Sequence, residues 1–360
     1  MRIAELFAGI GGVSLAVRGA GDVAVYCDIS TESQAALRSL MERGLIDRAP
    51  IHDDVRTLKL DGVDLITGGF PCQGNSSFGK RKGLEDPRSG LIREVFRLVE
   101  ESRPALVFLE NVKEVLQPQN GTVNFMVERF RELGYALAWT LVSAREMGLE
   151  HKRNRFFALA VRDGTPAATL QEALAGSQTY ALQGRGKEPP RMVLDGVKAE
   201  HLRRAGLYGN AVCPPAVKYA FEALLRVHLR GPGALAKPRE KHPRLPNRGY
   251  ADAAGVYEHS EAPENLNGQA NVVLLPDAYT PPDGYVGKNS LPRLTQPVHL
   301  KLWSTPRHGA PAASQVLTGR TKSDLGTQMR FDHRTPDDAR GGTPNADFVR
   351  YLMGYPPEWV

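Results

Sequence analysis

Short apolar runs alternate with longer amphipathic segments through about residue 160. The apolar runs contain β-branched residues and end at glycines or polar residues, which predicts buried strands. We expect strands at 3–7, 23–26, 63–67 and 105–109, helices at 13–18, 33–43, 91–101 and 122–133, and further segments of the same set near 137–143 and 156–161. This alternation predicts an α/β fold with a parallel sheet covered by helices on both faces.

The composition changes after about residue 230. Sixteen of the 26 prolines lie in residues 231–360, which disfavours long helices and regular sheet there. Segment 231–248 carries several Lys and Arg residues among prolines and predicts a basic linker or surface arm. We therefore expect two domains, a catalytic one at 1–229 and a smaller, irregular, loop-rich one at 230–360.

The bulk properties exclude several classes of protein. Three cysteines in 360 residues are too few for a disulfide framework, which favours a reducing, cytoplasmic setting. No apolar run approaches the roughly 18 residues of a membrane span, and no signal peptide is predicted. The net charge of +6 fits a polyanionic partner. We expect a monomer with no membrane partner and no metal site.

Candidate chemistry falls at the predicted carboxyl ends of the strands, where open α/β sheets bind ligands. Glycines at 9, 11 and 12 let the backbone approach a ligand, and Asp28 is suited to accept hydrogen bonds from ribose hydroxyls. Together they indicate an adenosine site, although the spacing is not that of a dinucleotide fingerprint. Asp54 is a possible acceptor for an adenine amino group, or simply part of an exposed acidic turn.

Cys72 lies on the loop that follows the strand at 63–67, after the glycines at 68 and 69. A cysteine carried on such a loop suits a nucleophile. A lone cysteine is more often a small buried core residue, so its neighbours decide between the two interpretations.

Five short motifs follow one another along the chain: Phe7 to Gly12, Pro71-Cys72-Gln73, Glu110-Asn111-Val112, Arg153-x-Arg155 and Gly209-Asn210-Ala211-Val212. In this order and rough spacing they resemble the motifs of the DNA cytosine-5 methyltransferases. The resemblance to this family covers about residues 1–160 and 205–229. The resemblance implies a Rossmann-like S-adenosylmethionine-dependent methyltransferase sheet and methylation of carbon 5 of cytosine in double-stranded DNA.

The resemblance also implies a role for each catalytic residue. Cys72 would add as a thiolate to carbon 6 of cytosine, which makes carbon 5 able to attack an electrophilic methyl group. Glu110 would stabilise ring nitrogen 3, with a pKa raised by burial. Arg153 and Arg155 would alternate on one strand, share a face, and fix the glutamate and the cytosine carbonyl.

Binding residues follow by the same resemblance. The cofactor S-adenosylmethionine would contact Phe7, Gly9, Gly11, Gly12, Asp28, Ile29, Asp54, Val55, Leu91, Asn210 and Ala211. The target nucleotide and its flanks would contact Pro71, Gln73, Ser76, Arg88 and Asn111.

The chain departs from the family's pattern at several places. Asn75 stands where an aromatic residue is usual, His151 where glutamine is usual, and Asp28 where glutamate is usual. About 50 residues separate Arg155 from Gly209, too few for the recognition region that the family usually places there. We therefore expect target recognition at the C-terminus, in residues 230–360, as in phage-type members, with the basic stretch at 185–204 as the other candidate.

Three other functions compete with DNA cytosine methylation. An RNA cytosine-5 methyltransferase would carry the same motifs. A catalytically silent DNA-binding relative is disfavoured by the intact Cys72, Glu110 and Arg153. Transfer of a different group from a modified cofactor would be favoured by a basic side chain in the cofactor pocket, and Asn210 is the ordinary residue type there.

Overall fold

The computed structural model describes residues 1–71, 89–117, 121–151, 153–184, 186–189, 192–193, 198–231, 236–238, 247–252, 256–259 and 343–359. The chain divides into two compact units. The sheet unit comprises Met1–Ser143, Asn154–Tyr180 and Pro214–Glu261, and the second unit comprises Ala144–Arg153, Ala181–Cys213 and Ala262–Val360. The units interleave along the chain, so this division differs from the boundary expected between residues 229 and 230.

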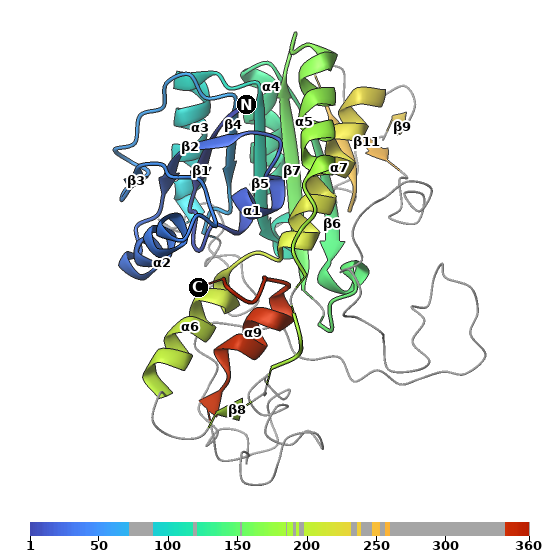
Figure 1. Cartoon of the computed structure of the whole chain (residues 1–360). Helices are drawn as coiled ribbons and strands as arrows, with labels where there is room; N and C mark the ends of the chain where they lie inside the picture. Colours follow the sequence, from blue (N-terminus) through green and yellow to red (C-terminus); the bar gives the residue numbers. More distant parts are fainter. Residues whose placement is uncertain are drawn as a thin grey trace, which may run out of the picture. The chain divides into compact units, whose positions relative to one another are not determined.

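A ten-stranded sheet forms the centre of the sheet unit (Figure 1). Its strands are β1 (Arg2–Leu6), β2 (Asp22–Cys27), β3 (Ile51–His52), β4 (Leu65–Gly68), β5 (Leu106–Val112), β6 (Tyr135–Ser143), β7 (Asn154–Arg162), β9 (Ala236–Pro238), β10 (Gly249–Ala251) and β11 (Val256–His259). Their order is β3-β2-β1-β4-β5-β7-β6-β10-β11-β9.

The predicted parallel pairing is confirmed for the first five strands of that order and is wrong for the rest. β3, β2, β1, β4 and β5 run parallel to their neighbours, whereas β7 is antiparallel to both β5 and β6. β6 and β7 are consecutive in the sequence, and no helix long enough to be a crossover lies between them. A parallel pair needs a crossover connection of a dozen or more residues, so this short link returns the chain in the opposite direction.

Helices cover both faces of the sheet. They are α1 (Gly12–Val17), α2 (Thr31–Glu42), α3 (Ile92–Ser102), α4 (Thr122–Glu132), α5 (Ala167–Thr179) and α7 (Pro214–Arg230). On one face Val107 and Leu109 of β5 join a buried cluster with α3 and α4. On the other face Phe108 meets Phe221 of α7 edge-on, with ring centroids 5.2 Å apart. Alternate side chains of β5 thus enter opposite cores, as a strand buried on both faces requires.

The segment at 231–248, which was predicted as a basic linker, contributes β9 to the sheet, and β10 and β11 follow it although regular sheet was not expected there. β10 pairs with β6, and β11 and β9 continue the sheet beyond it. Gly249 lies opposite Trp139 in this pairing, and a Cβ atom at Gly249 would lie 2.1 Å from the Trp139 ring. Only glycine fits there, and local sequence patterns do not show this cross-strand contact.

The second unit is built around two helices, α6 (Lys198–Asn210) and α9 (Ala346–Met353), which pack together. Two short strands, β8 (Met192–Val193) and β12 (Thr343–Pro344), pair antiparallel. Tyr208 donates a hydrogen bond to the carbonyl of Trp359, and both side chains are buried. The expected loop-rich C-terminal region therefore ends in a regular, well-packed helix. No helix in the described ranges is long and apolar enough to cross a membrane.

Candidate active site

Three loops that carry predicted cofactor residues lie at one edge of the sheet. Residues 7–11 follow β1, residues 28–30 follow β2, and residues 53–55 follow β3. These strands are parallel neighbours in the order β3-β2-β1, so their carboxyl ends share that edge. The structure thus brings together the predicted residues from Phe7 to Val55.

The loop after β1 makes a tight turn through left-handed backbone conformations. Phe7 has φ of 53°, Gly9 of 54° and Gly11 of 70°. A positive φ is uncommon for a residue other than glycine and strained for a bulky one, so such positions cluster at functional sites. The space where a Cβ atom of Gly9 would lie has no atom within 4 Å. Phe7 thus has a strained backbone, and Gly9 beside it adopts its conformation without strain and leaves open space that a ligand can approach.

Glu5 of β1 holds the start of the helix that follows this loop. It was not among the predicted site residues. Its carboxyl group is 1% exposed and accepts hydrogen bonds from the amides of Val13 (3.3 Å) and Ser14 (3.1 Å) in the first turn of α1. Burial raises the pKa of Glu5 to about 7, although these hydrogen bonds lower it. The available signal was an acidic residue inside the otherwise apolar run Ile3 to Leu6.

Asp28 is held rigidly at the end of β2. One carboxylate oxygen accepts from the amide of Gly9 (2.8 Å) and the other from the amide of Ser30 (2.9 Å). Each oxygen retains a lone pair for a further donor. The next residue, Ile29, is 71% exposed. Among the described residues, no other large hydrophobic side chain is exposed in this way. An oriented carboxylate beside an exposed apolar side chain suits a ribose and an aromatic base.

Asp54 follows β3 and forms a two-pronged ion pair with Arg56, whose Nη2 lies 2.6 Å from Oδ2. Hydrogen bonds from the Arg56 side chain and amide lower the pKa of Asp54 to about 2. Val55 is buried in the core cluster, and Leu91 packs against that cluster. Asp54 is thus a charged acceptor at the same edge as Asp28.

The predicted catalytic pair of Glu110 and an arginine is present. Glu110 lies in β5, and its Oε1 is 3.0 Å from Nε of Arg155 in β7; both side chains are mostly buried. A Cβ atom at Gly69 would lie 2.9 Å from Oε2 of Glu110, so the carboxyl group fills the space that a side chain at position 69 would need. Asn111 donates to the carbonyl of Phe70 (3.0 Å). Two consecutive residues of β5 therefore contact the segment that leads through Pro71 to Cys72.

Arg153 is placed differently from Arg155. β7 begins at Asn154, so Arg153 lies one residue before the strand, and the prediction that both arginines lie on that strand is wrong for Arg153. Arg153 is 4% exposed and donates to the carbonyls of Gly209 (3.1 Å) and Ala211 (2.6 Å). Both partners belong to the predicted cofactor motif around Asn210, within the second unit. The arginine that holds Glu110 is therefore Arg155, while Arg153 holds the loop at 209–211.

The remaining predicted residues Cys72, Gln73, Ser76 and Arg88 lie outside the described residues, as do Asn75 and residues 260–342.

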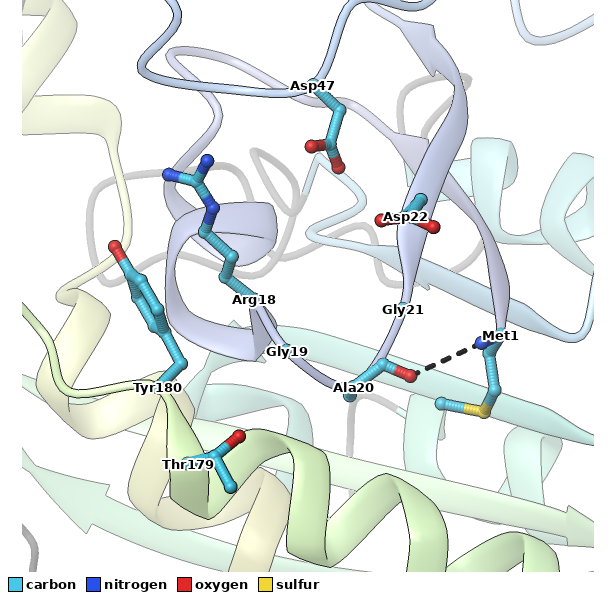
Figure 2. Close-up of a pocket in the computed structure, with 9 residues that line it drawn as sticks. All are labelled: Met1, Arg18, Gly19, Ala20, Gly21, Asp22, Asp47, Thr179 and Tyr180. Carbon is cyan, nitrogen blue, oxygen red and sulfur yellow. Dashed lines mark hydrogen bonds between the residues drawn. The ribbon is translucent and has the colours of Figure 1, made fainter.

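A surface pocket of about 580 Å³ opens at the other edge of the sheet (Figure 2). Arg18, Asp22, Asp47 and Tyr180 line it, beside the turn that leads into β2. Asp22 is the first residue of β2, so the pocket lies at the amino end of that strand, whereas the predicted cofactor residues follow the carboxyl ends of β1, β2 and β3. The pocket is therefore separate from the candidate active site.

Comparison with known proteins defines the class. The family model described as C-5 cytosine-specific DNA methylase matches residues 1–187. The type II methyltransferase M.CviJI of Paramecium bursaria Chlorella virus IL3A is 30% identical over 378 residues, which cover 100% of this chain and 97% of the relative. The type II methyltransferase M.HhaI of Haemophilus parahaemolyticus is 33% identical over 45% of this chain and 50% of its own length.

A solved structure described as a putative DNA modification methyltransferase encoded within an Escherichia coli prophage aligns over 57% of this chain and 64% of its own, with 23% identity and a TM-score of 0.39. The full-length match to the viral enzyme and the family match place the chain in the C-5 cytosine-specific DNA methylase family. It is a DNA cytosine methyltransferase with the methyltransferase-type α/β sheet, and the fold and enzyme class predicted from the motifs are confirmed.

Proposed function

We propose that this protein transfers the methyl group of S-adenosylmethionine to carbon 5 of cytosine within a specific sequence of double-stranded DNA. Cys72 serves as the nucleophile at carbon 6, and the target base leaves the helix so that its ring becomes accessible. The observation that carries the proposal is the packing of Glu110 and Asn111 against residues 69–70, directly before Cys72.

The cofactor edge fits an adenosine-bearing donor that has no phosphate. Helix N-termini commonly bind phosphates through their free amides. Here Glu5 already accepts from the amides of Val13 and Ser14, so these amides are not available to a phosphate. Asp28 and Ile29 supply a ribose acceptor and an apolar surface. S-adenosylmethionine fits these features, and when bound it supplies an electrophilic methyl group.

The other two cysteines are poor nucleophiles. Cys27 is 2% exposed, and burial together with the nearby Asp28 raises the pKa of its thiol to about 12. Cys213 is 3% exposed. A thiol reacts as its thiolate and needs access to the substrate. Because the chain has three cysteines, the burial of two supports Cys72 as the nucleophile.

The ion pair orients the proton donor. Addition of the Cys72 thiolate to carbon 6 places negative charge on the ring, and a protonated Glu110 donates to ring nitrogen 3 to stabilise that charge. Arg155 fixes the orientation of Glu110 through the 3.0 Å contact. After carbon 5 has received the methyl group, its proton leaves to a base, and the electrons of that bond expel the Cys72 thiolate.

Sequence recognition belongs, in this proposal, to residues 230–360, which supply basic residues and many prolines. Phosphate contacts there would make DNA affinity fall with salt by about 0.9 log units per log unit for each phosphate neutralised. A triple change of Arg307, Arg320 and Lys322 to Ala should reduce both affinity and salt slope. If it leaves both unaltered and changes at 185–204 alter the methylated sequence, recognition lies in that stretch.

A duplex that contains 5-fluorocytosine tests the mechanism, because fluorine at carbon 5 blocks release of the enzyme. We expect peptide mass spectrometry to locate a covalent adduct at Cys72, and Cys72→Ala to form none. Cys213→Ala is the matched control and should trap as the wild type does. An adduct at Cys27 or Cys213, or substantial turnover by Cys72→Ala, would contradict the proposal. Bisulfite sequencing of DNA and RNA incubated with the enzyme decides between the two substrates.

A further inference from the structure

Arg97 on α3 donates hydrogen bonds to several backbone carbonyls of the turn that follows β3. Nη2 of Arg97 donates to the carbonyls of Val55 (2.8 Å) and Leu58 (3.2 Å), and it lies 3.4 Å from the carbonyl of Arg56. The turn and the helix are about 40 residues apart in the sequence. Arg97 therefore forms a tertiary contact that neither segment makes alone.

Two glutamates hold the guanidinium group in place from its other side. Nε of Arg97 is 2.7 Å from Oε2 of Glu94, and Nη1 is 2.9 Å from Oε2 of Glu101. These residues lie three before and four after Arg97, so they share its face of α3. All three nitrogens of Arg97 are thus engaged. A planar guanidinium group can make this set of contacts, and a lysine ammonium cannot reproduce its geometry.

The turn that Arg97 holds begins at Asp54. The carbonyl of Asp54 accepts from the amides of Thr57 (3.1 Å) and Leu58 (3.2 Å), which closes the turn on itself. Val55 and Leu58 are buried in the same hydrophobic cluster as the apolar face of α3. The turn's own hydrogen bonds set its shape, and Arg97 ties that shape to the helix.

We propose that Arg97 is a positioning residue that fixes the turn at 55–58 so that the Asp54 carboxylate can accept a hydrogen bond from the 6-amino group of the donor's adenine. This inference rests on the proposed function, because it assumes an adenosine-bearing donor at this edge. In the structure Arg56 contacts both carboxylate oxygens of Asp54: its amide and Nε lie 2.9 Å from Oδ1, and its Nε and Nη2 lie 3.0 Å and 2.6 Å from Oδ2. The Arg56 side chain is 60% exposed, so it can turn into solvent and leave Oδ2 to the adenine amino group.

The test compares two ligands on the full-length protein. Calorimetry measures binding of S-adenosylhomocysteine and of its analogue whose purine lacks the 6-amino group. Arg97→Gln should weaken binding of the first ligand about 5- to 50-fold and of the analogue less than about 2-fold, because the analogue cannot use Asp54. An equal loss for both ligands would overturn the proposal, since a purely structural defect does not distinguish them.

Arg129 on α4 supplies a matched control. It is 32% exposed against 31% for Arg97, and it also pairs with two glutamates, Glu100 and Glu132. Arg129→Gln should leave both affinities within about 2-fold, because its partners lie outside the turn at 55–58. Arg97→Lys keeps the charge beside Glu94 and Glu101, so it serves as a second variant if Arg97→Gln does not fold. It should also weaken binding of S-adenosylhomocysteine more than binding of the analogue. Unfolding of both Arg97 variants would make the role structural and count against the proposal.

Asp54→Asn separates failure of this inference from failure of the proposed function. If Asp54→Asn leaves the affinity for S-adenosylhomocysteine unchanged, the adenine contact itself is absent. If Asp54→Asn weakens binding and Arg97→Gln does not, only the role of Arg97 is refuted. If both act, the double variant should lose less than the product of the two single effects, because the two residues act through one contact.

Discussion

In the sheet unit, each cofactor loop belongs to one short stretch of sequence, whereas the second unit is assembled from three stretches that lie far apart. The loop after β1 takes its turn and its helix cap from residues 5–14, and the nearby residues 27 and 28 accept hydrogen bonds from two of its amides. In the second unit, Tyr208 reaches Trp359 across 151 positions, and Arg204 reaches Asp347 across 143. Local chemistry thus sets the first region, and long-range packing sets the second.

The two arginines of the Arg-x-Arg motif differ in the unit to which their partners belong. Arg155 pairs across adjacent strands with Glu110, inside the sheet unit. Arg153 is buried against the carbonyls of residues 209 and 211, inside the second unit. A motif two residues apart therefore serves two units, one through a carboxylate and the other through the backbone. We expect variants in the two units to damage different steps.

The largest effect should come from Glu110. Glu110→Gln keeps the shape of the side chain but cannot deliver a proton to the ring, so kcat should fall about 10²- to 10⁴-fold. Affinity for S-adenosylmethionine should change little. Single-turnover methylation of a cytosine duplex measures the first quantity and calorimetry the second. A variant with nearly normal kcat would remove Glu110 from the chemistry.

Trp359→Ala should strongly lower the free energy of unfolding of the second unit and leave the stability of the sheet unit unchanged. The ring is 2% exposed and packs on Tyr355, with centroids 5.8 Å apart. Removing a buried tryptophan costs about 3–5 kcal/mol. Hydrogen exchange should show α6 losing protection while β1 keeps it. Equal loss in both elements would mean that the units unfold as one.

Arg153→Lys should weaken binding of S-adenosylmethionine by about 1.5–3 kcal/mol, because a lysine leaves one buried carbonyl without its charged donor. The binding loss is expected because Asn210 lies between the two carbonyls. Arg155→Lys is the paired variant and should lower kcat with little change in cofactor affinity. The distinction between the units fails if both variants change the same parameter.

Glu5 should give the smallest effect, seen as a dependence of stability on pH. Its pKa is raised from 4.5 to about 7 by burial, so the folded state holds the proton more tightly than the unfolded chain. The stabilisation is complete below the unfolded pKa and is lost as the pH rises through 7. The free energy of unfolding of the wild type should fall by about 2 kcal/mol between about pH 5.5 and about pH 8 because of Glu5, and that part of the fall should be absent in Glu5→Gln.

Urea unfolding of both proteins at the two pH values measures this difference. Equal pH dependence in the wild type and in Glu5→Gln would show that Glu5 is already ionised in the folded protein at the lower pH. Ser14→Ala removes the side-chain hydrogen bond that lowers the pKa of Glu5, so it should move the loss of stability to higher pH.

The sequence by itself determined the strand–loop–helix units of the sheet and the placement of Phe7, Gly9 and Asp28 at one edge. The structure added β3, and with it Asp54, to that edge. Hydrophobic periodicity and turn residues are local signals, and the carboxyl ends of parallel neighbours necessarily meet. The same signals placed Glu110 beside the glycine-rich turn. Glu5 was not predicted as a site residue although it is acidic inside an apolar strand, and its capping role became visible only in three dimensions.

Tertiary structure alone decided the reversal of β7, the addition of β10, β11 and β9 to the sheet, and the separate partners of Arg153 and Arg155. It also decided which segments form the second unit. Each of these depends on the complementarity of surfaces distant in sequence, as at Gly249 against Trp139. No local pattern encodes such a fit, because the free energy that selects it is gained only when both surfaces are already folded.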